Sequence, residues 1–162
     1  MKNPNGERQN MTEALTQEKI QEYIGKEIGL SSWMKITQER INAFAECTKD
    51  RQWIHIDPDK AKHGPYGTTI AHGFLILSLL VHLTSQIELF QKGIQMVTNI
   101  GLNRVRFSKP VRVGSSIRNR AVLKKAIDKG NGRILITVEN TIEIEGSAKP
   151  AMVAEVLALI LV

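Results

Sequence analysis

The spacing of apolar residues differs between the two halves of the chain. In the first half, apolar side chains recur at helical intervals, and the longest such stretch runs from Ala71 to about Phe90. In the second half, apolar and polar residues alternate, as at Ile134, Ile136 and Val138. A period of two is typical of half-buried antiparallel strands. The pattern therefore predicts one long, largely hydrophobic helix followed by at least four strands.

Capping and turn residues define the ends of the expected elements. Thr16 and Thr37 are suited to cap helices, and Asp57-Pro58 is typical of the first turn of a helix. The stretch from Asp128 to Gly132 predicts a hairpin. Besides the long helix, we expect helices over residues 15–23, after Thr37 and over 58–62, and strands from Leu30 to Ile36, around 104–107, 117–121 and 134–144, and from Met152 to Leu161.

These elements give an α+β fold in which an antiparallel sheet wraps around one long central helix. The 162 residues have the length of one domain, which we assign to residues 11–162. The polar residues 1–10 are expected to be a disordered or extended leader. A sheet of this kind has an open edge, and because a second copy can cover that edge, we expect a homodimer.

Composition and charge exclude some partners. The chain is 42% hydrophobic and 23% charged, as is usual for a globular protein, and its net charge is +6. Its basic residues are spread out instead of forming a run, and the chain has only two Trp, two Tyr and four Phe. We therefore expect a mildly basic face that suits an anionic ligand or is merely solvated, and no nucleic-acid binding.

The longest apolar stretch also bears on location. Residues 70–83 fall short of the roughly 20 residues that cross a bilayer, so no membrane partner is expected. The single cysteine, Cys47, cannot form an internal disulfide and is expected to be a small buried thiol. Because no signal-peptide pattern opens the chain, we expect a cytoplasmic protein.

Two residues near the start of the apolar stretch form a candidate acid–base couple. Asp50 and His55 are separated by a turn-forming segment that can bring both side chains to one point. A carboxylate can orient an imidazole or a water, and an imidazole titrates near neutral pH. The alternative is an Asp that caps a turn and a surface histidine. Gly73, at the start of the long helix, can offer its backbone N–H to a carbonyl oxygen, or can serve close packing.

Other histidines have simpler interpretations. His72 is expected to be a core or loop-locking group, and His63 and His82 to be structural or solvated. No ligand spacing typical of a metal site occurs, and no phosphate-binding or dinucleotide-binding loop is found. We therefore expect no metal and no cofactor.

The stretches DRQWIHID and GPYGTTIAHGFL resemble the MaoC-like dehydratase family, hot-dog-fold proteins that include R-specific enoyl-CoA hydratases. The pair Gln52-Trp53 resembles the branch similar to nodulation protein N, and the later GLNRVRFSKPVRVGSSIR resembles the family strand that begins the sheet. The resemblance implies that Asp50 and His55 share a catalytic water and that the Gly73 N–H meets the thioester carbonyl.

Two positions depart from the family pattern. Gln52-Trp53 replaces the usual Asn-Pro pair, and Val81 stands where some R-specific hydratases have a serine, with Ser78 one turn earlier. We expect Gly73, Gln52, Trp53 and Tyr66 to form the substrate-binding set, in which Trp53 and Tyr66 either narrow or cap the slot or simply pack at a turn.

The function implied by the resemblance is an enoyl-CoA hydratase that converts a trans-2-enoyl thioester to a 3-hydroxyacyl thioester, or the reverse. The substrate partner is then an acyl-CoA or an acyl carrier protein thioester. The alternatives are an acyl-CoA thioesterase and a non-catalytic acyl-thioester binding module. Four basic residues are candidates for the phosphates of coenzyme A: Arg104, Arg106, Lys109 and Arg112.

Overall fold

The computed structural model describes residues 16–91 and 93–162, and the expected leader over residues 1–10 lies outside this range. One antiparallel sheet dominates the described chain, with the strand order β1-β4-β5-β6-β3. A further short strand, β2, pairs with β4. The strands are β1 (Glu27–Leu30), β2 (Met34–Lys35), β3 (Met96–Phe107), β4 (Ser116–Asp128), β5 (Arg133–Ile144) and β6 (Met152–Leu161).

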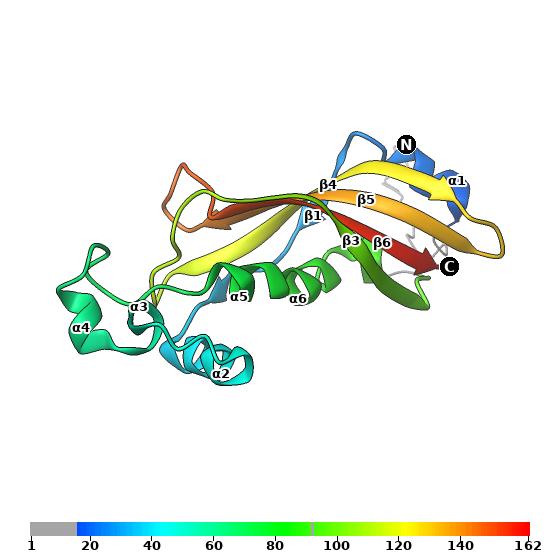
Figure 1. Cartoon of the computed structure of the whole chain (residues 1–162). Helices are drawn as coiled ribbons and strands as arrows, with labels where there is room; N and C mark the ends of the chain where they lie inside the picture. Colours follow the sequence, from blue (N-terminus) through cyan, green and yellow to red (C-terminus); the bar gives the residue numbers. More distant parts are fainter. Residues whose placement is uncertain (1–15, 92) are drawn as a thin grey trace, which may run out of the picture.

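Most helices lie on one side of this curved sheet, and α1 lies at one of its ends, near the end of β4 (Figure 1). α5 and α6 run beneath the sheet, α2 lies below α5, and α3 and α4 extend beyond the end at which α5 begins. The helices are α1 (Gln17–Glu22), α2 (Gln38–Thr48), α3 (Trp53–Ile56), α4 (Pro58–Lys62), α5 (Gly73–Ser78), α6 (Leu80–Ser85) and the 3₁₀ turn η1 (Glu88–Gln91). The expected α+β class, with an antiparallel sheet on a central helix, is confirmed.

The central helix is shorter than predicted. It begins at Gly73, is interrupted at Leu79 and ends at Ser85, whereas the apolar pattern predicts a helix over residues 71–90. The N–H of Leu79 donates to Leu75 and the N–H of Leu83 to Leu79, so the two pieces share one axis. After Ser85 the chain continues into the 3₁₀ turn η1, and between them the Gln86 side chain accepts a hydrogen bond from the backbone of Ser32, at 3.0 Å.

The prediction of one continuous strand from Leu30 to Ile36 is wrong, because this part of the chain forms the end of β1 and the separate short strand β2. Residues 31–33 lie outside both strands, although the N–H of Ser31 still donates to the backbone carbonyl of Asn119 on β4. The hydroxyl of Ser31 accepts from the N–H of Asn119 at 2.9 Å, and the N–H of Ser32 donates to the Gln86 side chain instead of to a strand. Side-chain hydrogen bonds thus interrupt the strand after Ser31.

Local signals for caps and turns are confirmed. The side chains of Thr16 and Thr37 each accept from the N–H three residues later, as N-caps do. Asp57 accepts from the N–H of Lys60 at 2.9 Å and caps α4, with Pro58 in its first turn. The hairpin between β4 and β5 also lies where the sequence predicts it, and Asn131 there adopts a left-handed φ of 55°.

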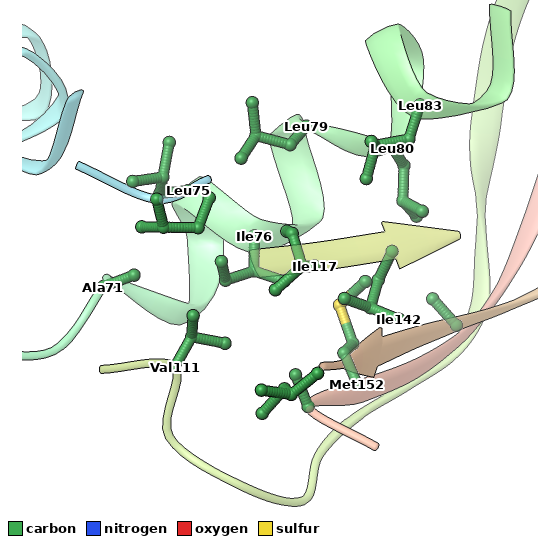
Figure 2. Close-up of a cluster of buried hydrophobic side chains, with 14 of the residues drawn as sticks. Ala71, Leu75, Ile76, Leu79, Leu80, Leu83, Val111, Ile117, Ile142 and Met152 are labelled. Carbon is green, nitrogen blue, oxygen red and sulfur yellow. The ribbon is translucent and has the colours of Figure 1, made fainter. Parts of the chain in front are cut away.

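The core lies between the central helix and the concave face of the sheet (Figure 2). From the helix, Leu75, Ile76 and Leu83 are buried; they meet Ile142 and Met152 on the sheet. Burial of each such side chain contributes about 1.5–3 kcal/mol, so this layer anchors the helix firmly. A second buried cluster at the other end of the sheet gathers residues of α1, the η1 region and the strands: Ile20, Ile28, Ile87, Ala121, Leu123, Ile134, Ile136, Val138, Ala158 and Ile160.

The edge strand β3 is exposed along nearly its whole length. Only Val105 is half-buried, whereas Phe107, predicted to be half-buried as well, is 49% exposed. Ile100 and Leu102 are also open to solvent, at 54% and 46%. An exposed apolar edge strand of 12 residues is unusual for an isolated domain, and it leaves a pairing surface free.

Two further predictions concern single features. Cys47 is exposed, so the expectation of a buried thiol is wrong; the buried face of α2 is made by Ile41 and Ala45 instead. Within residues 16–91 and 93–162, no helix has the length and apolar character needed to cross a membrane.

Candidate active site

Asp50 lies in the loop after α2, and His55 approaches it from the short helix α3. α2 ends at Thr48, and Lys49 follows in the left-handed conformation with φ of 63°, which turns the chain before Asp50. His55 lies in the single turn of α3 and is only 6% exposed, whereas Asp50 is half-buried. The alternative of a surface histidine is therefore wrong for His55. Ligand-type atoms of both residues and of His72 lie within 4.8 Å of one another.

The orientation of the His55 ring is set by a backbone carbonyl. Its Nδ1 lies 2.7 Å from the carbonyl oxygen of Ile70 and must donate to it, because a carbonyl can only accept. The other ring nitrogen, Nε2, is then free for proton transfer. Burial lowers the pKa of His55 below its ordinary value, and this effect outweighs the hydrogen bond to Ile70, which raises it.

His72 touches both members of the pair. Its ring is 3% exposed and stacks on the ring of His55, with centroids 3.7 Å apart and an angle of 25° between the planes. Its Nε2 donates to the backbone carbonyl of Asp50 at 2.9 Å. This contact matches the expected loop-locking role, but its Nδ1 is buried without a hydrogen-bond partner.

Gln38, which the sequence analysis does not single out, braces this arrangement. Its side-chain Nε2 donates to the backbone carbonyl of His55 at 2.7 Å and to the Asn42 side chain at 2.8 Å. Its Oε1 accepts from the Thr69 hydroxyl at 2.5 Å. Gln38 thus joins the backbone of His55 to the segment whose next residue, Ile70, orients the His55 ring.

The expected substrate-binding residues lie in different surroundings. Gln52 is exposed and its side-chain amide donates to Oδ1 of Asp50 at 3.2 Å, so it reaches the carboxylate itself. The Trp53 ring packs against the loop after α4: a Cβ added at Gly64 would lie 2.8 Å from it, and the Lys60 ammonium lies 5.1 Å from its centroid. Tyr66 is half-buried in the same loop.

Gly73 is the first residue of α5 and faces the end of β3. A Cβ added to it would lie 3.2 Å from the Phe107 ring, which is tighter than ordinary contact. Among the described residues, no hydrogen bond uses the N–H of Gly73, as is usual for the first turn of a helix. This position therefore combines a free donor with close packing, and both interpretations of the glycine agree with the structure.

An apolar groove follows the exposed face of the central helix. Its volume is about 590 Å³, and it runs between the helix and strands β3, β5 and β6. From the helix, Ser78 and Val81 line it, and Ile100 and Leu102 line it from β3. Asp50, His55 and Gly73 do not line it, but Phe74, next to Gly73, lies one helical turn before Ser78 on the same face.

Comparison with known proteins places this site in a family. The MaoC-like domain matches residues 19–146, which is well over half of the chain. The chain belongs to the MaoC-like family. The match includes the segment with Asp50 and His55, the start of the central helix and strands β1 to β5, so the sequence resemblance to MaoC-like proteins is confirmed.

Two curated MaoC-like relatives are similar over most of their length. One is 3-hydroxyacyl-thioester dehydratase Z of Mycobacterium tuberculosis, 53% identical over 131 residues, which cover 81% of this chain and 86% of the relative. The other is nodulation protein N of Rhizobium leguminosarum, 41% identical over 138 residues, or 85% and 86% of the two chains. The monoamine oxidase regulatory protein of Archaeoglobus has a similar structure, with a TM-score of 0.74, 26% identity and coverage of 91% and 95%.

One group of side chains in this MaoC-like protein has the residue types and spacing of a cation site. Asp50, His55 and His72 are within reach of one ion, but the two imidazole rings are stacked nearly face to face. The lone pairs of an imidazole lie in its ring plane, so those of two stacked rings do not converge on one ion. The arrangement suits an acid–base couple better than a metal centre.

The basic residues suggested for phosphate binding are exposed near the end of the MaoC-like sheet. Arg104, Arg106, Lys109 and Arg112 all lie on the surface, in or just after β3. Lys109 is held by the Ser147 hydroxyl at 2.8 Å, and Arg106 donates to the backbone of Val105. Within the described residues none of the four forms an ion pair, so their charge is available to an anionic ligand.

Proposed function

We propose that the chain is a hydro-lyase that adds water to a trans-2-enoyl thioester to give a 3-hydroxyacyl thioester, and catalyses the reverse dehydration. The observation that carries this proposal is the pairing of a half-buried carboxylate, Asp50, with a buried imidazole, His55, whose Nε2 is free. The MaoC-like family and the 53% identity to a 3-hydroxyacyl-thioester dehydratase support the same reaction.

The chemistry requires one proton to be taken and one to be given. The thioester carbonyl withdraws electrons, so C3 of the enoyl group is electrophilic, and polarisation of that carbonyl by the N–H of Gly73 favours attack by water. Asp50 and His55 hold the water: one accepts its proton as the C3–O bond forms, and one delivers a proton to C2. A lowered pKa keeps His55 neutral near pH 7, in the form that holds a water through its Nε2 lone pair.

The groove along α5 and α6 is the proposed acyl site. Its lining is mainly apolar, with Val81, Ile100 and Leu102 among the contributors, and it begins one helical turn beyond Phe74. A thioester whose carbonyl lies at Gly73 can extend its acyl chain along this face of the helix. The exposed Arg104, Arg106, Lys109 and Arg112 are proposed to meet the phosphates of coenzyme A or of the phosphopantetheine on an acyl carrier protein.

We also propose that two copies pair through β3. The exposed apolar side chains of this edge strand continue onto Phe74 and Val81 of the helix, which are 69% and 63% exposed. Pairing along β3 covers these residues and closes the open side of the acyl groove.

We also propose a cytoplasmic location. The only cysteine, Cys47, makes no disulfide within the chain.

The test follows the enoyl-thioester absorbance of crotonyl-CoA and of one longer enoyl-CoA, with thiol release measured in parallel. We expect wild type to consume substrate without releasing thiol, Asp50→Asn to lose activity by about 1,000-fold or more, and Asp59→Asn, on the exposed side of α4, to keep it. Thiol release would point to a thioesterase. Tight acyl-CoA binding without consumption would point to a binding module and would overturn the proposal.

A further inference from the structure

Among the residues around the pair, His72 has the most unusual combination of contacts. It bonds the backbone of Asp50 and stacks on the ring of His55, so one side chain connects the loop after α2 with the helix α3. On its other side, the Phe44 ring of α2 lies 5.1 Å from it, at an angle of 53°. His72 is therefore held between α2 and α3, and it is the N-cap residue that directly precedes α5.

The hydrogen bond to Asp50 determines which nitrogen of His72 carries a proton. The Asp50 carbonyl can only accept, so Nε2 must be the donor. Nδ1 of the neutral ring then presents a lone pair, yet it is buried and no donor reaches it. Buried polar atoms without partners are rare in proteins and destabilise the folded state, so packing alone does not account for an imidazole here.

An apolar ring of similar size would fill the same space without leaving an unpaired nitrogen. Phenylalanine, however, could not donate to the Asp50 carbonyl. Glutamine could donate from a similar position, but it could not stack on His55. Histidine combines a flat ring and a donor in one side chain, and each of these features contacts a different member of the acid–base pair.

We propose that His72 is a positioning residue that fixes Asp50 and His55 relative to each other, through its Nε2–H tautomer and its ring face. This inference rests on the proposed hydration reaction, because it assigns His72 to the same site. Stacking sets the plane in which His55 Nε2 points, and the hydrogen bond sets the backbone from which the Asp50 carboxylate extends. Both groups must meet one water, so a shift of about 1 Å in either reduces turnover by about 100-fold.

Two complementary variants separate the two contacts. His72→Gln keeps a donor for the Asp50 carbonyl and loses the stack, whereas His72→Phe keeps the stack and loses the donor. We expect each to lower kcat by about 10- to 100-fold with KM changed less than about twofold, since neither contact reaches the substrate. We expect the urea unfolding midpoint of His72→Phe to change little, because the substitution removes the unpaired Nδ1 but also leaves the Asp50 carbonyl without its donor. His63→Gln, at an exposed histidine of the loop after α4, is the matched control and should retain wild-type kinetics.

A spectroscopic measurement tests the inference without turnover. In wild type, long-range nitrogen–proton correlation of the imidazole rings should show His72 as the Nε2–H tautomer, and a His72 with its proton on Nδ1 would overturn the proposal. Folded variants with wild-type kcat would also overturn it. An inactive wild type with the Nε2–H tautomer in place would instead count against the hydration reaction, so the two failures are distinguishable.

Discussion

The side-chain amide of Gln38 donates to the backbone carbonyl of His55 at 2.7 Å, across 17 residues of sequence. The same side chain accepts from Thr69, the neighbour of the residue whose carbonyl orients the His55 ring. The Gln38 amide therefore fixes the backbone of His55 directly, and through Thr69 it holds the segment whose Ile70 carbonyl orients the His55 ring. Its importance for stability and for turnover can be measured separately.

Gln38→Leu should destabilise the fold and slow the reaction. The change leaves the His55 carbonyl and the buried Thr69 hydroxyl without their partner, which costs about 1–3 kcal/mol in the free energy of unfolding. Urea denaturation and steady-state kinetics measure the two effects. Asn42→Ala removes only the exposed partner of Gln38 and is the control. Equal stability of the two variants would show that the buried bonds contribute little.

The activity of wild type should persist to lower pH than an ordinary histidine would allow. Because burial lowers the pKa of His55, its Nε2 stays unprotonated below pH 6.5, the ordinary value for the side chain. The acidic limb of the kcat/KM profile should therefore lie below 6.5. A limb centred at or above 6.5 would contradict the assignment of His55 to that ionisation.

The same shift predicts how stability depends on pH. The unfolded chain binds the His55 proton more readily than the folded chain, so the contribution of neutral His55 to stability is present above pH 6.5 and is lost as pH falls through the lowered pKa. Urea denaturation between pH 7.5 and 5 should thus show a steeper loss for wild type than for His55→Gln. His63→Gln should follow wild type, because that histidine is exposed.

Gly73→Ala should lower kcat/KM by about 100-fold if the backbone N–H there polarises the carbonyl, since a methyl group blocks the approach. The added methyl also meets the Phe107 ring at 3.2 Å. Phe107→Leu makes room for it, so the double variant Gly73→Ala with Phe107→Leu separates the two effects. Continued low activity in the double variant supports the role of the N–H, whereas full recovery would assign the glycine to packing alone.

Ile100→Glu should convert a dimer to monomers. Ile100 is 54% exposed in the middle of β3, and a charge there opposes burial against a second copy. Ile127→Glu, on β4 and 48% exposed, is the matched control outside β3. Sedimentation equilibrium of the three proteins gives their masses. An Ile100→Glu protein with the mass of wild type would exclude β3 as the interface.

The sequence predicts the class of the fold and the position of its catalytic candidates better than it predicts their supports. The last strand, Met152–Leu161, has the predicted bounds, because its apolar run and the turn residues before it are local signals. The predicted burial of Cys47 and the predicted ends of the central helix were wrong, since both depend on how the elements pack in the fold, which the local sequence does not show.

The candidate site shows the same division. Asp50, His55 and Gly73 belong to a motif that is recognisable in the sequence. The burial of His55 and its hydrogen-bond partners could not be predicted from the sequence. The role of Gln38 depends on contacts with residues 17 and 31 positions away, and a polar residue in the first turn of an amphipathic helix carries no signal of them. The Gln52 side chain lies at the Asp50 carboxylate, a contact that residue spacing alone does not predict.

The groups that hold the acid–base pair all come from one continuous stretch, residues 38 to 72, whereas most of the groove is lined by α5, α6 and strands β3, β5 and β6. In the proposed assignment, chemistry and chain-length preference are therefore carried by separate parts of the polypeptide. Substitutions at Val81, Ile136 or Val156 can reshape the groove without touching any hydrogen bond to His55 or Asp50. An enzyme built in this way can acquire new acyl preferences, through selection or by design, while its catalytic segment stays unchanged.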